Sequence, residues 1–251
     1  MPDAGRYFDT RAPSYDAAYD TPGADGYALR SRLETVLSLA GDGPGEALDA
    51  GMGPGRLVAE LEDRGWTVSG VDASSEMVAA ARGKVPGASE RLVQATIESL
   101  PFPDATFDAV FATGVLEYAE VEAAILELAR VLRPGGLAVV SYPNPRVLYG
   151  IWKTRVWYPA VRVTKRVARR PMVFPRGSRT LDPKAFRELL TASGLAGERV
   201  EYTSYLVLPT PLDLALPKTA ERLGRRLDRS GPQLSRRLAG QLVYAARKLP
   251  S

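Results

Sequence analysis

The hydrophobic positions along the chain follow two patterns. Between residues 25 and 40, apolar side chains recur mostly at steps of three and four, which predicts a helix that ends at the glycine-rich stretch 41–45. From residue 46 onward, short apolar runs of strand length alternate with further helical stretches. Such alternation through short loops favours parallel strands joined by right-handed crossovers. We expect strands at 46–50, 67–71, 91–95, 107–112 and 137–142, and helices at 56–64, 75–82 and 120–131.

The two ends of the chain are patterned differently. Residues 1–22 are polar and aromatic, and we interpret 1–24 as an N-terminal lid segment that contains a short helix. Towards the C-terminus, a helix at 183–193 is expected to begin at Asp182, a good N-cap residue. It precedes two strands, 199–208 and 242–247, which flank a proline- and arginine-rich insertion, 209–237.

Together these elements predict one α/β domain over 1–251. Its sheet is expected to be doubly wound, seven-stranded and mostly parallel, with one antiparallel strand near the C-terminal edge. In sheets of this kind, ligands bind at the carboxyl ends of the strands, where the strand order reverses. We expect a site there, covered by the N-terminal lid segment and by the insertion 144–180.

Composition narrows the chemistry of that site. The chain has 251 residues, 45% of them hydrophobic and 25% charged, which is close to the average of soluble globular proteins. It has no cysteine and no histidine, which excludes disulfides, thiolate or imidazole metal sites and cysteine nucleophiles. A general base must therefore be Asp, Glu, Tyr, Lys or water. We recognise neither a signal peptide nor a membrane-spanning run, and we expect a cytoplasmic protein.

A glycine-rich loop follows the first expected strand, in the order Asp49-Ala50-Gly51-Met52-Gly53-Pro54-Gly55. Glycines let the backbone turn tightly and approach a ligand, and the next helix directs its N-terminus there. Taken alone, the loop is equally typical of a packing turn. Asp72 ends the next strand about twenty residues later, where an acid can accept hydrogen bonds from ribose hydroxyls or cap the following helix.

The spacing of these glycines separates two classes of cofactor. A dinucleotide loop has the form G-x-G-x-x-G, whereas here the third glycine comes one residue early and Arg56 takes its place. The loop therefore favours a nucleoside without a pyrophosphate. A nicotinamide-dependent oxidoreductase stays as the disfavoured alternative.

Four stretches in order carry a family resemblance: 47–57, 71–74, 99–108 with Leu-Pro-Phe and Phe-Asp, and 132–136. Together they resemble the class I S-adenosylmethionine-dependent methyltransferases that act on small molecules. The resemblance implies a Rossmann-like methyltransferase fold and S-adenosylmethionine as cofactor.

The resemblance also implies roles for particular residues. Gly51 and Gly53 are expected beside the methionine moiety, with Asp49 at its amino group and Asp72 at the ribose. Ala73 and Met77 flank the adenine, Tyr15 closes over the cofactor, and Thr113 lies near it. The family often places an aspartate before the Leu-Pro-Phe stretch, at the adenine amine. Here that position is Thr96, followed by Ile97, so a hydroxyl or a backbone carbonyl must replace the carboxylate.

The candidate catalytic residues follow the fourth expected strand. Glu117 is the candidate base, with Tyr118 and Tyr142 as orienting groups, and its alternative interpretation is a solvated side chain. Related enzymes often have histidines at 117 and 118, which this chain lacks. A sulfonium donor needs mainly positioning of the reactants. We expect methyl transfer to an oxygen of a small-molecule acceptor, because oxygen acceptors are common in the resembled family and the chain offers no strongly basic machinery.

Two further alternatives stay open. One is methylation of nitrogen or carbon in a lipid-like or acidic acceptor. The other is a catalytically silent nucleoside-binding or membrane-associated partner protein. The Ala, Gly and Arg content fits a bacterial protein of secondary metabolism, and the oligomeric state is not predicted.

The positive charge is concentrated in the insertion 144–180. Between residues 141 and 181 there are ten basic residues and no acidic one, together with Trp152 and Trp157. Three interpretations remain: a lid alone, a lid with peripheral contact to the inner membrane surface, and a lid over an acidic acceptor. The insertion 209–237 is also basic. Neither has a nucleic-acid-binding module, so no nucleic acid partner is expected.

Overall fold

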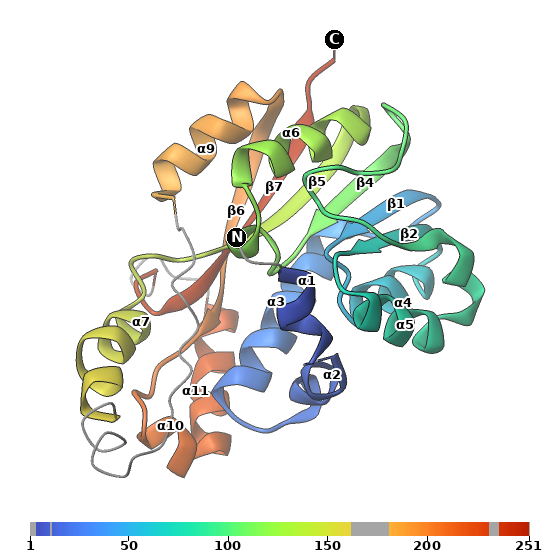
Figure 1. Cartoon of the computed structure of the whole chain (residues 1–251). Coiled ribbons are helices and arrows are strands. Elements are labelled where there is room, and N and C mark those ends of the chain that lie inside the picture. The colour runs from blue at the N-terminus through green and yellow to red at the C-terminus, as the bar shows by residue number, and fades with distance from the viewer. Residues whose placement is uncertain (1–3, 11, 162–180, 231–235, 251) are drawn as a thin grey trace.

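The computed structural model describes residues 4–10, 12–161, 181–230 and 236–250. Within them, seven strands form one sheet in the order β3-β2-β1-β4-β5-β7-β6 (Figure 1). All neighbours are parallel except β7, which pairs antiparallel with both β5 and β6. The predicted seven-stranded sheet with one antiparallel strand is confirmed. Its strands are β1 (Gly45–Ala50), β2 (Trp66–Asp72), β3 (Leu92–Gln94), β4 (Phe107–Ala112), β5 (Leu132–Pro143), β6 (Leu195–Tyr205) and β7 (Ala239–Lys248).

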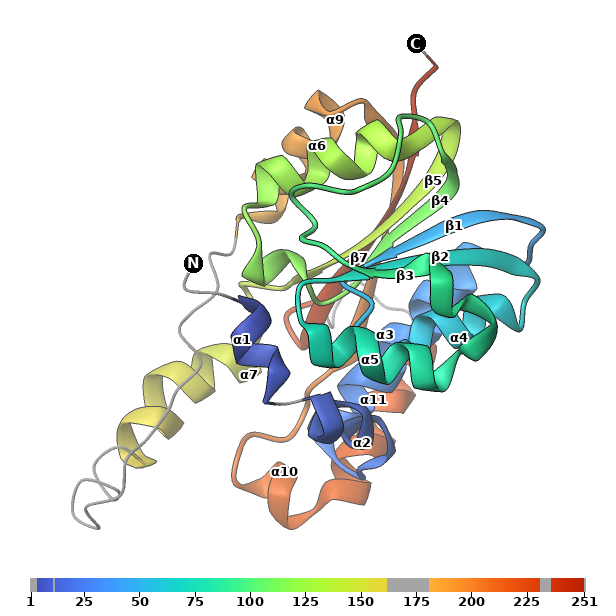
Figure 2. The same cartoon turned by 45° about the vertical axis from the view of Figure 1, so that its right-hand side comes forward.

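Helices cover both faces of the sheet (Figures 1 and 2). On one face lie α3 (Ala24–Ala40), α4 (Arg56–Glu62) and α5 (Ser75–Lys84), and on the other lie α6 (Val121–Val131) and α9 (Pro183–Ala192). Side chains alternate between the faces along each strand. In β1, Leu48 packs in the cluster that includes α6 and α9, whereas its neighbour Ala47 packs in the cluster that includes α3 and α4.

The expected elements differ from the observed ones mainly at their ends. The N-terminal segment contains two helices, α1 (Ala4–Asp9) and α2 (Ala12–Asp20), rather than one. Strand β5 begins at Leu132 rather than at 137, so it includes the stretch 133–136. Its register against β4 shifts between Phe107 and Ala109. Strand β6 ends at Tyr205 rather than at 208, and prolines follow closely. Asp182 caps α9 as predicted, and its carboxylate accepts the Lys184 N–H.

Both expected insertions contain helix. In 144–180, α7 (Leu148–Trp152) continues into a π-helical turn, η3 (Lys153–Trp157); residues 162–180 lie outside the described ranges. In 209–237, a short α10 (Leu212–Ala215) precedes α11 (Pro217–Ser230), which lies beside α3 and β6. Across the described residues, we find no helix with the length and hydropathy needed to cross a bilayer.

Candidate active site

A cavity of about 290 Å³ opens at the carboxyl ends of β1, β2 and β4, and α1, α2 and α3 contribute to its wall. This is the position where the strand order reverses, as predicted. The cavity brings together every residue expected around the cofactor: Tyr15, Asp49, Gly51, Gly53, Asp72, Ala73, Met77, Thr96, Ile97 and Thr113.

The glycine loop passes close to the floor of this cavity. Gly51 has a φ of 82° in the left-handed region, and a Cβ there would lie 2.6 Å from the Cβ of Val115. Gly53 has a φ of 53°, but a Cβ there would meet no atom of the described residues within 4 Å. Glycine is therefore required at 51 by the protein itself, and the open space at 53 suits a ligand that approaches the backbone.

Asp72 fastens the loop to the end of β2. Its Oδ2 accepts the Gly53 N–H and its Oδ1 accepts the Ser74 N–H, each at 2.9 Å. Burial raises the pKa of Asp72, and these two hydrogen bonds oppose the increase. The alternative role as N-cap of α5 is wrong, because Ser74 is the cap and its hydroxyl accepts the Met77 N–H.

Asp49 is the most deeply buried carboxylate of the cavity, with 1% of its surface exposed. Its Oδ1 has no hydrogen-bond partner within the described part of the chain. Burial, assisted by the negative charge of Asp72, raises the pKa of Asp49 to about 8. A buried carboxylate without a partner is costly, and a cationic group is its natural complement. The α-ammonium of S-adenosylmethionine supplies such a cation, so the residues present fit this cofactor.

Arg32 on α3 supplies a buried positive charge that the sequence interpretation missed. It lines the cavity with 7% of its surface exposed, and its guanidinium lies against Gly114. Tyr15, Tyr19 and Glu117 are close enough to raise its pKa against the effect of burial. The helical pattern did indicate that Arg32 is buried, because this residue falls on the apolar face of the helix, one turn before Val36.

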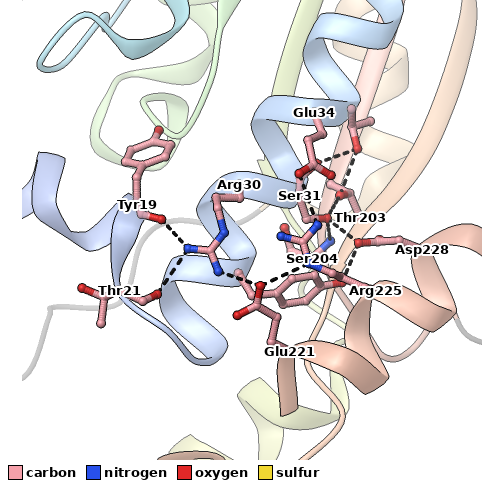
Figure 3. A network of polar contacts seen from close by, with 12 residues as sticks. Tyr19, Thr21, Arg30, Ser31, Glu34, Thr203, Ser204, Glu221, Arg225 and Asp228 are labelled. Carbon is pink, nitrogen blue, oxygen red and sulfur yellow. Dashed lines mark hydrogen bonds and ion pairs between the residues drawn. The ribbon is translucent and has the colours of Figure 1, made fainter. Parts of the chain in front are cut away.

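A polar network holds α3, and with it Arg32, against β6 and α11 (Figure 3). The Ser31 hydroxyl and the Tyr27 hydroxyl both donate to Oδ2 of Asp228, at 2.6 and 2.5 Å. Ser31 also lies 2.5 Å from the Thr203 hydroxyl on β6. Since Ser31 precedes Arg32 in the chain, this network fixes the turn of helix that carries the cavity's arginine.

The N-terminal helices α1 and α2 form one side of the cavity wall. Phe8 on α1 and Tyr15 and Tyr19 on α2 line it. Arg56, the first residue of α4, forms an ion pair with Asp16 of α2 at 3.0 Å, and this contact fixes α2 to α4. Arg56, which occupies the place of the third glycine of a dinucleotide-binding loop, therefore holds α2 beside the cavity.

The three candidate catalytic residues have different surroundings. Tyr118 lines the cavity, and its ring meets Phe8 edge-on at 5.0 Å. Glu117 lies in a 3-10 turn, η2 (Leu116–Tyr118), and is not itself among the lining residues. The residue is partly buried, and its Oε2 is buried with no hydrogen-bond partner among the described residues. Burial raises the pKa of Glu117, and Arg32 opposes this. The alternative interpretation of Glu117 as a solvated side chain is wrong.

Tyr142 lies in the hydrophobic core and not in the cavity lining. Its ring stacks on Phe186 of α9 at 4.6 Å, and its hydroxyl accepts the Leu181 N–H at 2.8 Å. Tyr142 is turned away from the cavity because successive side chains of β5 point to opposite faces of the sheet. Ser141 points the other way and accepts the Gly114 N–H at 2.9 Å.

Comparison with known proteins agrees with this geometry. A methyltransferase domain model matches residues 48–140. A demethylmenaquinone methyltransferase of Thermus thermophilus is 40% identical over 146 residues, which are 55% of this chain and 65% of that protein. A malonyl-[acyl-carrier protein] O-methyltransferase of Enterobacter lignolyticus is 34% identical over 55% of each chain. These two matches thus cover less than two thirds of each relative.

A further relative is matched over most of its length. A demethylmenaquinone methyltransferase of Mycolicibacterium paratuberculosis is 32% identical over 201 residues, 70% of this chain and 84% of that protein. In fold, the chain is similar to an S-adenosylmethionine-dependent methyltransferase of Thermotoga maritima, with a TM-score of 0.65, 19% identity, and coverage of 97% and 99% of the two chains. The chain therefore belongs to the class I S-adenosylmethionine-dependent methyltransferases, a family of enzymes with S-adenosylmethionine as cofactor.

Proposed function

We propose that this protein transfers the methyl group of S-adenosylmethionine to a hydroxyl oxygen of a small-molecule acceptor. The observation that carries the proposal is the partly buried Glu117 side chain, whose Oε2 is buried with no hydrogen-bond partner among the described residues. Tyr118, the next residue in the chain, lines the cavity that fits the cofactor. When bound, the cofactor supplies an electrophilic methyl group on a sulfonium. The protein has to position the acceptor, exclude water and take up one proton.

Three charged side chains are suited to hold the cofactor. Asp49 offers a buried carboxylate to the ammonium, and Asp72 offers carboxylate lone pairs to the ribose hydroxyls at the end of β2. Arg32 offers the buried positive charge that a methionine carboxylate needs. The aromatic rings of Phe8 and Tyr15 cover this arrangement and keep water from the reacting groups.

Glu117 is suited to act on the acceptor hydroxyl. Its pKa is raised by burial, which makes its carboxylate a stronger base than an exposed glutamate. Arg32 opposes that increase and favours the charged form that accepts a proton. Tyr118, next in the chain and in the cavity wall, is suited to orient the acceptor.

A second acceptor atom has support of its own. The relative matched over 84% of its length is a demethylmenaquinone methyltransferase. Removal of a proton from a hydroquinone hydroxyl activates the adjacent ring carbon, so the same glutamate serves methylation of carbon. The candidate acceptor in that case is a lipid-like hydroquinone.

The test is turnover with a panel of acceptors. The purified protein is incubated with S-adenosylmethionine and phenols, hydroxy acids, hydroquinones or amines, and S-adenosylhomocysteine is measured. Nuclear magnetic resonance of the product then locates the methyl group on oxygen, carbon or nitrogen. Calorimetric binding of S-adenosylmethionine without turnover on any acceptor supports the silent nucleoside-binding alternative instead.

The role of Glu117 is tested on the acceptor that gives turnover. We expect Glu117→Gln to lower kcat by about 100-fold or more while S-adenosylhomocysteine binding stays within about twofold. Glu122→Gln is the matched control, because Glu122 is exposed on α6 and the charge change is the same. Equal kcat in both variants contradicts a base role for Glu117.

A further inference from the structure

The exposed apolar side chains of this protein are concentrated on two short segments. Among the described residues, ten large apolar side chains are exposed, and seven of them lie in 148–156 and 212–216. We call these seven the α7–α10 face. They are Leu148, Ile151, Trp152, Val156, Leu212, Leu214 and Leu216.

The two segments of the α7–α10 face are joined by buried polar contacts. The Tyr149 hydroxyl donates to Asp213 Oδ2 at 2.6 Å and lies 3.0 Å from the Thr210 hydroxyl. The Trp152 indole N–H donates to the Thr210 carbonyl at 2.9 Å. Figures 1 and 2 both place α7 and α10 at the same end of the molecule, away from the sheet. Two insertions that are distant in sequence therefore place their exposed apolar residues at one end of the molecule.

The exposed charges within these two segments are of one sign. Residues 146–161 contain no acidic residue, and in 212–220 Asp213 is the single acid, buried against Tyr149. Arg155 is exposed on η3, and Lys218 is exposed at the start of α11. A surface of exposed leucines with basic neighbours is complementary to an anionic, apolar partner.

We propose that the α7–α10 face docks this protein on the surface of an anionic lipid bilayer. Leucines and isoleucine enter the region between headgroups and acyl chains, and Trp152 lies at the interface, where its ring is amphipathic. Basic side chains remain among the anionic headgroups. A bilayer is favoured over a protein because it requires no groove, and this face lies outside the cavity described above. The inference does not depend on which atom is methylated.

The test is co-sedimentation of the full chain with vesicles. We expect binding to vesicles that contain phosphatidylglycerol, weaker binding at high salt, and about tenfold weaker binding to pure phosphatidylcholine vesicles. The double variant Leu148→Glu with Leu214→Glu is expected to lose at least about tenfold in binding to the anionic vesicles. Binding of S-adenosylhomocysteine by the variant confirms that it is folded.

A matched control separates this face from the general surface. Leu126 on α6 is 57% exposed, and Leu126→Glu introduces the same charge elsewhere. It is expected to bind vesicles like the unaltered protein. Equal loss in Leu126→Glu, or absence of binding by the unaltered protein, overturns the proposal. So does a dimer in light scattering that the double variant abolishes, since the face is then an interface between two copies.

Discussion

Asp49 and Asp72 end neighbouring parallel strands and share one cavity, but their carboxylates are stabilised differently. Asp72 accepts two backbone N–H groups, from Gly53 and Ser74, whereas Oδ1 of Asp49 is buried with no partner in the part of the chain that the structure describes. The sheet register places Ala50 opposite Val71, so the two acids lie near adjacent strand ends. Asp72 therefore fixes the loop in addition to its proposed role at the ribose, whereas Asp49 is available to a cationic ligand.

Asp49→Asn is expected to stabilise the cofactor-free protein above mildly acidic pH and to abolish most cofactor binding. The pKa of Asp49 is about 8 in the folded chain, against 3.8 for an ordinary aspartate. From about pH 4 to about pH 8 the folded state therefore keeps a proton that the unfolded state has lost, and the free energy of unfolding decreases as pH rises. Urea unfolding of both proteins across this range measures the difference, which should grow with pH and level off near pH 8.

The same carboxylate gives cofactor affinity its own pH dependence. An ammonium favours the charged form of Asp49, so the affinity of the unaltered protein should increase as pH approaches 8, with release of a proton on binding. Asp49→Asn should bind at least about tenfold more weakly, with a smaller pH dependence. Calorimetry in two buffers of different ionisation enthalpy detects the proton. Unchanged affinity in the variant contradicts this role.

Alanine at two neighbouring glycines should have two different effects. Gly51→Ala places a Cβ within 2.6 Å of Val115 at a φ of 82°, so we expect a loss of unfolding free energy of about 2 kcal/mol or more. Gly53→Ala meets no atom of the described ranges within 4 Å, so its cost to stability is confined to the backbone, about 1 kcal/mol. Its Cβ enters the space of the cofactor, and binding should weaken.

The comparison requires both measurements on both variants. Thermal unfolding without cofactor ranks stability, and S-adenosylhomocysteine titration ranks affinity. If Gly53→Ala binds as well as the unaltered protein, the cofactor does not approach the loop backbone at this residue.

Thr96→Asp should strengthen cofactor binding. Thr96 lines the cavity beside Ile97, at the position where the family often has an aspartate for the adenine amine. One added hydrogen bond is worth about 1 kcal/mol, so the dissociation constant of S-adenosylhomocysteine should fall by about fivefold. Thr96→Val is the control: a weaker affinity in it shows that the threonine hydroxyl already contributes. No gain in Thr96→Asp means that the adenine does not lie against this residue.

Asp228→Ala should lower the free energy of unfolding by about 2 kcal/mol, because it leaves the Tyr27 and Ser31 hydroxyls without their shared acceptor. Arg226→Ala, exposed on the same helix, should stay within about 0.5 kcal/mol of the unaltered protein. Chemical denaturation checks both. Cofactor affinity should also fall in Asp228→Ala, because the network holds the helix turn that carries Arg32 (Figure 3). Equal stability of the two variants contradicts a structural role for the network.

The cofactor side of the site could be predicted because it depends on local patterns. Asp49, Gly51 and Asp72 belong to strand ends and tight loops, where neighbours in sequence are neighbours in space. Arg32 was missed for the opposite reason. It approaches Glu117 only through the packing of α3 on the sheet, and a charge within an apolar helical stripe does not identify its distant partner.

The sequence interpretation expected Tyr142 in the site, but its side chain points to the other face of β5. Because both faces of β5 are buried, the sequence does not reveal whether Ser141 or Tyr142 points towards the cavity. Similarly, the positions of the helices in the two insertions were not predicted, because their buried contacts run from one insertion to the other. The buried Tyr149 hydroxyl donates to Asp213, a residue more than sixty positions further along the chain.

Strand β7 has a consequence for the synthesis of this protein. It pairs with both β5 and β6, yet it follows both of them along the chain. While a ribosome is still translating the residues before Ala239, the growing sheet ends at an open edge of β5, and β6 has no strand beside it. Open edges recruit strands from other molecules. Nascent chains on the ribosome are therefore prone to aggregate until β7 has been synthesised. We expect their need for chaperones to be greatest during that interval.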